Sequence, residues 1–401
     1  MQRIPAARER RSGNESTTSI HVPGAPYDDV VVPLLESARS VLPPGTRWTD
    51  AHTHTGFSDP DGVTASAQEL LAGLDRAGSE RAVVFTTAEP AGYPPANDRV
   101  LAEAAASGRR LVPFCRVDPN AADPVGEAGR CFAAGARGIK LHPRSDDFAL
   151  PHPQVEALVV FAAEHGAPVL FHAGRGIPAL GEEVTRLAGA HPDARLILAH
   201  AGISDLGLLS HVIAETPNIY FDTSWWQVSD VLALMAVVPP GQVLYASDMP
   251  YGSGRFAALN LVRCAREVGH GPEALQAMAG AQVERLLAGE EPLDVGPAPG
   301  LRAAGHRWLA GERIVSYTSA ALQTAFRGFD PTEALALARL ACQVPTGGAR
   351  SVCDEAELLL ACDELLARAQ EALAADPEHP RRISYAALSA HVLAGTPRVP
   401  V

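Results

Sequence analysis

Two histidines separated by one residue are the first feature of this 401-residue chain that suggests chemistry. In the segment Asp50-Ala51-His52-Thr53-His54, both imidazoles point to one face if the segment is a β-strand, because side chains alternate along a strand. Imidazole nitrogen and carboxylate oxygen suit a borderline divalent cation, so we expect Zn²⁺, with Mn²⁺ or Fe²⁺ as alternatives. Asp50, on the same face one layer deeper, is expected to accept a hydrogen bond from a histidine rather than to bind the ion.

Further histidines fall at the predicted ends of other strands. A lone histidine in such a position is more often a buried, hydrogen-bonded residue than a ligand, but several at matching positions favour a site. In barrel enzymes the reacting side chains gather at the carboxyl ends of the strands, where the loops leave an open mouth. Five of the 14 histidines and one aspartate meet this criterion: His52, His54, His142, His172, His200 and Asp248.

Other polar and aromatic residues near these strand ends are weaker candidates for contacts with a substrate. Arg175 could clamp a carboxylate with its planar guanidinium, although a surface salt bridge explains it equally well. Trp225 and Trp226 could wall a pocket, and ordinary packing is the alternative. Arg116 could point inward or pair with Asp118.

The elements that must position these residues are visible as a repeat. Short β-branched or apolar runs recur along the chain, each followed by a stretch of helical period rich in Ala, Leu, Glu and Arg. This alternation predicts β-α units and a parallel sheet, and eight such runs can close a barrel. We therefore predict an α/β fold, a (β/α)₈ TIM barrel. The expected strands are TRWTDAHTH ending at His54, RAVVFTT, RLVPFCRV, ARGIKLH, APVLFHAG, RLILAHAG, NIYFDTS, and QVLYASD ending at Asp248.

The chain changes character after Gly289, where the run EEPLDVGPAPG has the composition of a linker. We predict an N-terminal extension over residues 1–45 with a disordered polar beginning, a barrel over 46–290, and an all-helical C-terminal domain over 300–401. Helices are expected from Ser66, over 124–134, 154–165 and 182–190, within 272–287, from the segment Asp330-Pro331-Thr332-Glu333, and over 356–374. The last of these carries a stripe of leucines, which predicts that this face lies in the hydrophobic core or in a dimer interface.

Composition narrows the class of protein. A formal net charge of −13, with no basic cluster in the body of the chain, argues against nucleic acid and anionic membranes as partners. No apolar stretch approaches the roughly 20 residues of a membrane span, and the N-terminus lacks the apolar middle of a secretory signal. The six cysteines form no C-x-x-C pair, so a reducing cytoplasm fits best and Cys115 is expected to be a buried thiol rather than a nucleophile. A small-molecule substrate and a homodimer, through the barrel or the C-terminal helices, are the expected partners.

Taken together, the strand-end motifs resemble the amidohydrolase superfamily. The closest branch is the amidohydrolase-related group, amidohydrolase 2, which also holds aminocarboxymuconate-semialdehyde and resorcylate decarboxylases. The resemblance covers about residues 48–287, with Gln282 near a position where the family has Asn, and the C-terminal region lies outside it. The motifs are Asp-x-His-x-His on the first strand, Gly-Ile-Lys-Leu-His-Pro on the fourth, Phe-His-Ala-Gly on the fifth, Leu-Ala-His-Ala-Gly on the sixth and Ser-Asp-Met-Pro on the eighth.

The resemblance implies a mononuclear site with His52, His54, His172 and Asp248 as ligands, Asp248 also acting as proton acceptor for water. His200 would serve as acid, base or oxyanion stabiliser. A bound divalent ion lowers the pKa of water to roughly 7 and polarises a carbonyl. The predicted function is hydrolysis of a C–N or C–O bond in an amide, lactone or cyclic imide. Non-oxidative decarboxylation of a carboxylate-bearing molecule is the alternative on the same site, and a non-catalytic scaffold with a helical partner-binding region is a third.

Lys140 bears on the metal count. A carboxylated Lys140, as in one branch of the superfamily, would complete a binuclear set with His172 and His200. Against this, Lys140 shares a strand face with His142 and lies one layer below the strand end. The motifs around it look more like the mononuclear branch. We therefore expect one ion, with Lys140 and His142 as weaker candidates for substrate contacts.

Overall fold

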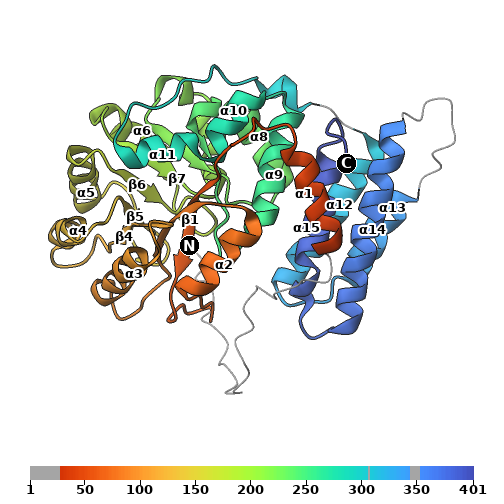
Figure 1. Cartoon of the computed structure of the whole chain (residues 1–401), viewed down its shortest axis with the longest axis horizontal. Helices are drawn as coiled ribbons and strands as arrows, with labels where there is room; N and C mark the ends of the chain where they lie inside the picture. The colour runs from red at the N-terminus through yellow and green to blue at the C-terminus, as the bar shows by residue number, and fades with distance from the viewer. Residues whose placement is uncertain (1–27, 306–307, 344–352) are drawn as a thin grey trace, which may run out of the picture.

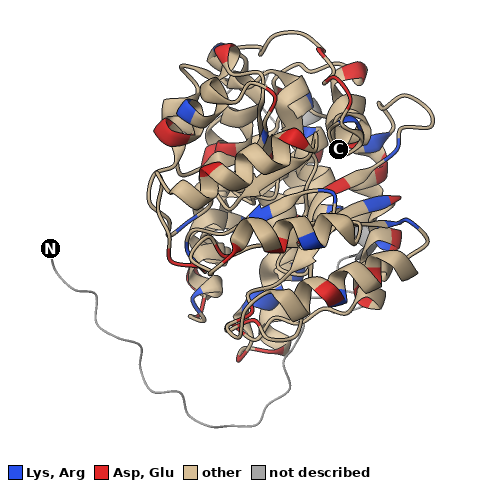
Figure 2. Cartoon of the chain, turned by 90° about the vertical axis from the view of Figure 1, so that its left-hand side faces the viewer, with Lys and Arg blue, Asp and Glu red and all other residues tan. Residues whose placement is uncertain are grey.

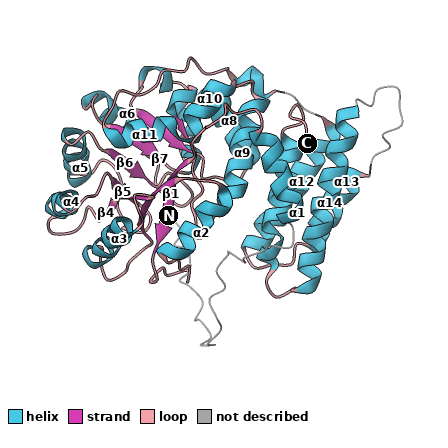
Figure 3. Ribbon diagram, in the orientation of Figure 1, coloured by secondary structure: helices cyan, strands magenta, loops and turns pink. Residues whose placement is uncertain are grey.

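The computed structural model describes residues 28–305, 308–343 and 353–401, so the polar N-terminal tail predicted to be disordered lies outside the described residues. Figure 1 shows a ring of strands and helices with a second group of helices, α12 to α15, packed beside it. The colouring of Figure 3 separates the same two parts, since the strands lie in the first part and the second is helical.

The strands are parallel and form two hydrogen-bonded series, β1-β2-β3 and β4-β5-β6-β7-β8-β9. The third predicted strand is split at Phe114 into β3 and β4, but the backbone N–H of Phe114 still donates to the carbonyl of Val84. The strands are β1 Thr49–Thr55, β2 Arg81–Thr86, β3 Leu111–Pro113, β4 Cys115–Arg116, β5 Ile139–Leu141, β6 Pro168–Phe171, β7 Arg195–Leu198, β8 Ile219–Asp222 and β9 Val243–Leu244.

Backbone hydrogen bonds also join the last strand to the first. The N–H of Ala51 donates to the carbonyl of Tyr245, and the N–H of His54 donates to that of Met249. These bonds close the ring, so the predicted α/β barrel is confirmed. Buried residues from both series, among them Phe85, Phe114 and Tyr220, fill its interior together with Leu286 of the helix that follows the barrel.

Helices alternate with these strands, and their ends carry the expected signals. Ser66 accepts a hydrogen bond from the N–H of Glu69, whose side chain bonds back to Ser66, and Gly78 ends that helix in the left-handed conformation at φ 67°. Proline starts α4 and α5. The helices are α1 Asp28–Arg39, α2 Ala67–Ala77, α3 Pro94–Ala106, α4 Pro124–Ala133, α5 Pro153–Glu164, α6 Gly181–Ala190, α7 Leu206–Leu209, α8 Val228–Val237, α9 Gly254–Glu267, α10 Pro272–Gln276 and α11 Gln282–Ala288.

The second part of the molecule is helical throughout its described residues. The leucine stripe predicted on α14 is buried, which makes it core. The helix expected from Asp330 begins two residues later, at Thr332, whose N–H bonds to the Asp330 side chain. The elements are α12 Leu309–Phe326, α13 Thr332–Cys342, α14 Cys353–Ala375, the short 3₁₀ helix η6 Pro380–Ile383, and α15 Ser384–Gly395.

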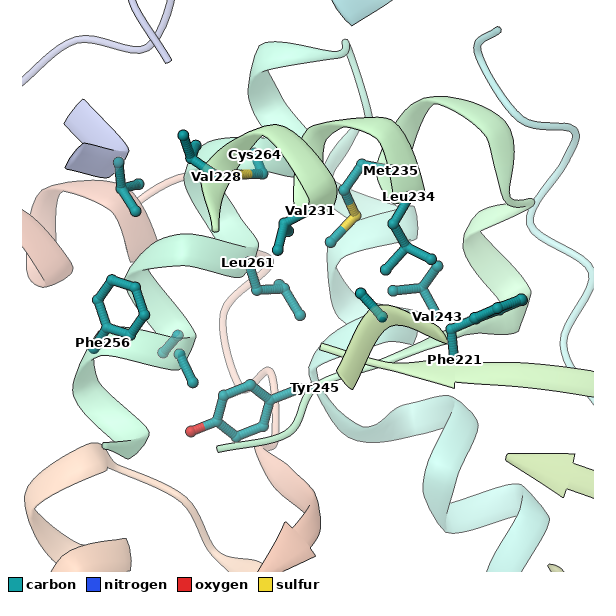
Figure 4. Packing of buried hydrophobic residues seen from close by; sticks show 14 of the residues in the cluster. Phe221, Val228, Val231, Leu234, Met235, Val243, Tyr245, Phe256, Leu261 and Cys264 are labelled. Atoms are coloured by element: carbon teal, nitrogen blue, oxygen red, sulfur yellow. The ribbon is translucent and has the colours of Figure 1, made fainter. Parts of the chain in front are cut away.

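Helices α8 and α9 form the layer between the barrel strands and the C-terminal helices. Figure 4 shows Val231 and Met235 of α8 with Leu261 of α9 packed over the strand ends at Val243 and Phe221, in a core that continues into α12, α14 and α15. The barrel and the C-terminal helices therefore share one apolar core. No helix among the described residues has the length and apolar character of a membrane span. Figure 2 shows acidic and basic residues interspersed over the face it presents.

Candidate metal and catalytic site

Three side chains converge at the carboxyl end of the barrel. His52 and His54 of β1 point their Nε2 atoms at each other across 3.1 Å. Asp248, in the loop after β9, places Oδ1 3.0 Å from Nε2 of His54 and 3.3 Å from Nε2 of His52. One ligand atom from each residue lies within 4.8 Å of the other two, so the structure brings these three predicted residues together.

The backbone is strained where two of the predicted residues sit. His200 has φ 57° and Asp248 has φ 59°, in the left-handed region that non-glycine residues rarely occupy. A chain holds such conformations only where the surrounding structure forces them, and they cluster at functional sites. The N–H of Asp248 donates to the carbonyl of His52, which fixes the loop against β1.

Asp222, at the end of β8, orients His52. Its Oδ2 lies 2.7 Å from Nδ1 of His52, and both side chains are fully buried. Although burial opposes ionisation, the His52 imidazole and the hydrogen bond from Ser224 hold the pKa of Asp222 below its usual range. Burial, helped by the charge of Lys140, lowers the pKa of His52 to about 3. The neutral ring therefore donates from Nδ1 to Asp222 and presents an unprotonated Nε2 to His54 and Asp248.

Asp50 accepts a hydrogen bond from His52, as expected, but from its backbone N–H rather than from its imidazole. Asp50 lies opposite Ala82, but Thr53 lies opposite Val84, so three steps along β1 correspond to two along β2. This shift breaks the regular alternation that would place Asp50 under the histidines. Its Oδ1 instead accepts from the backbone N–H groups of His52 and Ser247, 3.1 and 3.0 Å away, and so ties β1 to the loop after β9.

His200 and His172 form a second pair beside this group. Nδ1 of His200 lies 2.9 Å from the carbonyl oxygen of Ser224, and Nε2 lies 3.0 Å from Nδ1 of His172. Because a carbonyl only accepts, His200 donates from Nδ1; in the tautomer whose Nε2 carries no proton, that nitrogen accepts from Nδ1 of His172. Nε2 of His172 is left with a free lone pair, and it is buried without a hydrogen-bond partner among the described residues.

His172 lies outside the group of three, although it lines the same pocket. Its ring stacks on that of His142, with centroids 3.9 Å apart and planes 10° from parallel. A Cβ at Gly174 would lie 2.8 Å from Cδ2 of His200 and 3.1 Å from Cε1 of His172, so the absence of a side chain there lets the two rings sit side by side. Burial, then the neighbouring His200, lowers the pKa of His172 below the usual range.

The donor set fits a divalent cation. Two imidazole Nε2 atoms and a carboxylate oxygen face one another within contact distance, an arrangement that gains from a shared cation. Burial lowers the pKa of both His52 and His54, so neither needs to lose a proton in order to bind metal near neutral pH. The free Nε2 of His172 is a further nitrogen donor of the right kind. Mixed nitrogen and oxygen donors match zinc among the common cations.

Two buried cations line the same pocket. Lys140 and Arg116 are almost fully buried, and Nζ of Lys140 and Nε of Arg116 have no hydrogen-bond partner in the described part of the chain. Burial lowers the pKa of Lys140 to about 7. The acid beside Arg116 is Asp146, with Nη2 3.5 Å from Oδ1, rather than the Asp118 considered from the sequence. Free donors next to a reaction centre are suited to an anionic group of a ligand.

The remaining predicted residues take different positions. Arg175 lies over the Trp225 ring, 5.2 Å from its centroid, so it stacks on an aromatic face at the pocket. Trp225 and Trp226 both line the cavity, as considered from the sequence. Cys115 is buried, and its pKa is raised well above the usual range by its contact with Cys131 and by burial, which opposes a role as a nucleophile.

The pocket has a volume of about 1440 Å³ and holds every residue that the sequence proposed for the site. Sequence reasoning missed two kinds of residue. Asp222 ends β8 and lies two positions before Ser224, where the predicted strand ended, so its position near a strand end could have identified it. Phe326, Tyr385 and Leu388 also line the pocket, and no sequence signal placed the C-terminal helices against it.

Several solved structures are similar to this chain in fold. An amidohydrolase from Burkholderia multivorans solved with bound zinc is 13% identical, with a TM-score of 0.51 over 60% of this chain and 99% of that one. A second crystal form of that protein, with bound HEPES, has the same identity and coverage and a TM-score of 0.50. For 5-carboxyvanillate decarboxylase from Sphingomonas paucimobilis, the values are 15% identity, 61% and 99% coverage, and a TM-score of 0.48. A search of curated proteins finds no match.

The structural likenesses, at such low identity, show the fold alone. The family model described as amidohydrolase matches residues 49–280, which is more than half of the chain and spans β1 to η4, the single π-helical turn Ala277–Ala281. The C-terminal helices lie outside the matched range. The chain belongs to the amidohydrolase family.

Proposed function

We propose that this protein is a metal-dependent hydrolase that cleaves a C–N or C–O bond in an amide, lactone or cyclic imide. The observation that carries the proposal is the convergence of the Nε2 atoms of His52 and His54 and the Asp248 carboxylate at the barrel mouth. We assign His52, His54, His172 and Asp248 as the ligands of one divalent ion, with zinc favoured over Mn²⁺ or Fe²⁺. The zinc in the Burkholderia amidohydrolase supports this choice.

A divalent cation held by these residues would supply Lewis acidity and so lower the pKa of water toward neutral pH, where loss of a proton yields a nucleophile. The protein supplies proton transfer and orientation. Asp248 takes a proton at its carboxylate, and His200 exchanges a proton at Nε2 with the leaving group or with a developing oxyanion. The carbonyl of Ser224 accepts from Nδ1 of His200, so Nε2, which lies 3.0 Å from Nδ1 of His172, is the ring nitrogen left to exchange a proton. In the same way, the Asp222 carboxylate accepts from Nδ1 of His52 and leaves Nε2 of His52 for the cation.

The test is a reaction screen with defined metal content. Protein purified without chelators is analysed for metal, depleted, and reloaded with Zn²⁺, Mn²⁺ or Fe²⁺, and each form is assayed against small amides, lactones and cyclic imides. We expect one equivalent of metal and turnover that returns with it. Near two equivalents, falling toward one in Lys140→Ala, would contradict the mononuclear site. Loaded protein that turns over none of these classes would contradict hydrolysis.

Decarboxylation is the second candidate, and one observation favours it. A decarboxylase on this site must hold a carboxylate, and Nε of Arg116 and Nζ of Lys140 are buried donors in the same pocket that have no hydrogen-bond partner among the described residues. The same loaded protein is therefore assayed for CO₂ release from aromatic acids. Release that depends on Arg116 and Lys140, without any hydrolysis, would replace the first candidate.

The other sequence predictions stand as proposals. We propose a barrel unit over residues 46–290 and a helical unit over 300–401, with residues 1–45 as an extension. A small-molecule substrate is the partner that the proposed reaction requires. Homodimer formation, a cytoplasmic location and the absence of nucleic acid as a partner remain predictions.

A further inference from the structure

Part of the pocket wall comes from the C-terminal helices rather than from the barrel. Phe326 ends α12, and Tyr385 and Leu388 lie in the first half of α15, yet all three line the cavity that holds His52, His54 and Asp248. These residues are far from the barrel motifs in sequence and lie outside the range matched by the family model. The wall is therefore a property of this chain's own C-terminal region.

Aromatic rings connect this wall to the reaction centre. The ring centroids of His200 and Trp225 are 6.5 Å apart, those of Trp225 and Trp226 are 6.0 Å apart, and those of Trp226 and Phe326 are 5.7 Å apart with the planes at 75°. Both tryptophans and Phe326 are only partly buried. They present aromatic surface along a path that begins at the residue assigned to proton transfer.

The C-terminal helices are fixed to the barrel at this position. His391 of α15 is fully buried; its Nε2 accepts from the N–H of Val228, 3.3 Å away, and its Nδ1 lies 2.8 Å from the hydroxyl of Thr318. Val228 starts α8, directly after the loop that carries the two tryptophans. A Cβ at Gly395 would lie 2.7 Å from Cγ1 of Val228, so α15 and α8 approach as closely as glycine allows. Helix α15, which carries Tyr385 and Leu388 of the wall, is therefore docked directly on the start of α8.

We infer that Phe326, Tyr385 and Leu388, together with Trp225 and Trp226, form a subsite for a planar apolar group of the substrate. This inference rests on the proposed function for the position of the reacting bond, which lies at His52, His54 and Asp248. The cavity of about 1440 Å³ exceeds the roughly 300–1,000 Å³ of ordinary small-molecule pockets, so it has room for a group beyond the reacting one. The substrate class is then an aryl-bearing amide, ester or acid rather than a small polar metabolite.

The test uses two hydroxamates that bind metal through the same group. Acetohydroxamate and phenylacetohydroxamate are titrated into the zinc-loaded full-length protein by calorimetry. Burial of a phenyl ring against this wall should make phenylacetohydroxamate bind about tenfold tighter or more. Phe326→Ala and Tyr385→Ala should each lower the ratio of the two affinities, phenylacetohydroxamate over acetohydroxamate, several-fold. The affinity for acetohydroxamate itself should not change. Phe326→Leu, which keeps apolar volume without a ring, should fall between.

Phe329→Ala is the matched control. Phe329 lies three residues beyond Phe326, is 65% exposed and does not line the pocket, so its loss should not change the ratio. A ratio near one in the wild type would overturn the inference. So would a ratio unchanged in both wall variants, or lowered equally by Phe329→Ala.

A second measurement separates this inference from the proposed function. The wall consists of protein side chains alone, so 2-naphthoate should bind the metal-free protein and quench its tryptophan fluorescence. Phe326→Ala and Tyr385→Ala should weaken that binding, and Phe329→Ala should not. If acetohydroxamate fails to bind the zinc-loaded protein while these naphthoate results hold, the metal site is wrong and the subsite stands. If naphthoate does not bind, or binds all variants equally, the subsite is wrong, whether or not acetohydroxamate binds the zinc-loaded protein.

Discussion

The buried basic side chains at the barrel mouth and those at the C-terminal helices differ in their hydrogen bonding. At the mouth, His172 Nε2, Lys140 Nζ and Arg116 Nε have no hydrogen-bond partner among the described residues. Among the C-terminal helices, His391 bonds at both ring nitrogens. The buried Arg263 of α9 donates to the hydroxyl and carbonyl of Thr396 and to the carbonyls of Val399 and Pro400.

An unpaired buried donor costs free energy, and a paired one costs little. Unpaired buried groups are retained where a ligand supplies the missing hydrogen bonds. Paired buried groups are retained where their hydrogen bonds stabilise the fold. We therefore expect substitutions at the mouth to change metal binding and turnover, and substitutions at the C-terminal contacts to change stability.

The largest effect should follow loss of a proposed ligand. His52→Ala, His172→Ala or Asp248→Ala should abolish turnover and lower the metal content, because each removes one of few donors from the ion. Elemental analysis and activity assays check this. His191→Ala is the control, since His191 is partly exposed and pairs with Glu156 away from the pocket. Metal content and turnover unchanged in a ligand variant would contradict that assignment.

A smaller effect on metal is expected at His200. His200→Asn should keep nearly normal metal occupancy and lose about a hundredfold or more in kcat, the scale of a general acid or base. The two readouts should separate, because the hydrogen bonds of His200 go to His172 and Ser224 rather than to the group of three. Loss of metal in parallel with rate would place His200 among the ligands.

Asp222 should act through His52. Asp222→Asn keeps the shape of the side chain and removes the charge opposite Nδ1 of His52. Loss of such an outer partner typically weakens metal affinity about 10- to 100-fold. Competition with a chelator measures the change. Asp193→Asn, at an exposed position before β7, controls for the loss of one negative charge. Equal affinity in Asp222→Asn and wild type would show that Asp222 does not support the metal site.

Substitutions at the C-terminal contacts should have the smallest effect on metal binding at the barrel mouth. Arg263→Met leaves the carbonyls around Thr396 and Val399 without their donor and should lower the free energy of unfolding by about 2–4 kcal/mol. Metal content should stay normal. Denaturant unfolding measures the loss, and Arg266→Met on the same helix is the control. A destabilisation no larger than the control's would show that these bonds do not hold the chain end.

Local patterns in the sequence determined much of this molecule. The alternation of apolar runs and helical stretches predicted the barrel, because each β-α unit must bury its faces in the same way. Strand ends placed His52, His54, His172, His200 and Asp248 in one pocket, because parallel strands bring their carboxyl ends to one side. The capping residues at Ser66 and Glu69 started a helix where expected, since a cap acts within one turn.

Only the tertiary structure decided the rest. Because of the one-residue register shift in β1, Asp50 bonds to backbone N–H groups and the imidazole of His52 bonds to Asp222. Strand register depends on the neighbouring strand. The wall at Phe326 and Tyr385 depends on how α15 docks on Val228, which is a fit between surfaces distant in sequence. Sequence spacing carries no information about such contacts, because the residues meet only after each element has formed and packed.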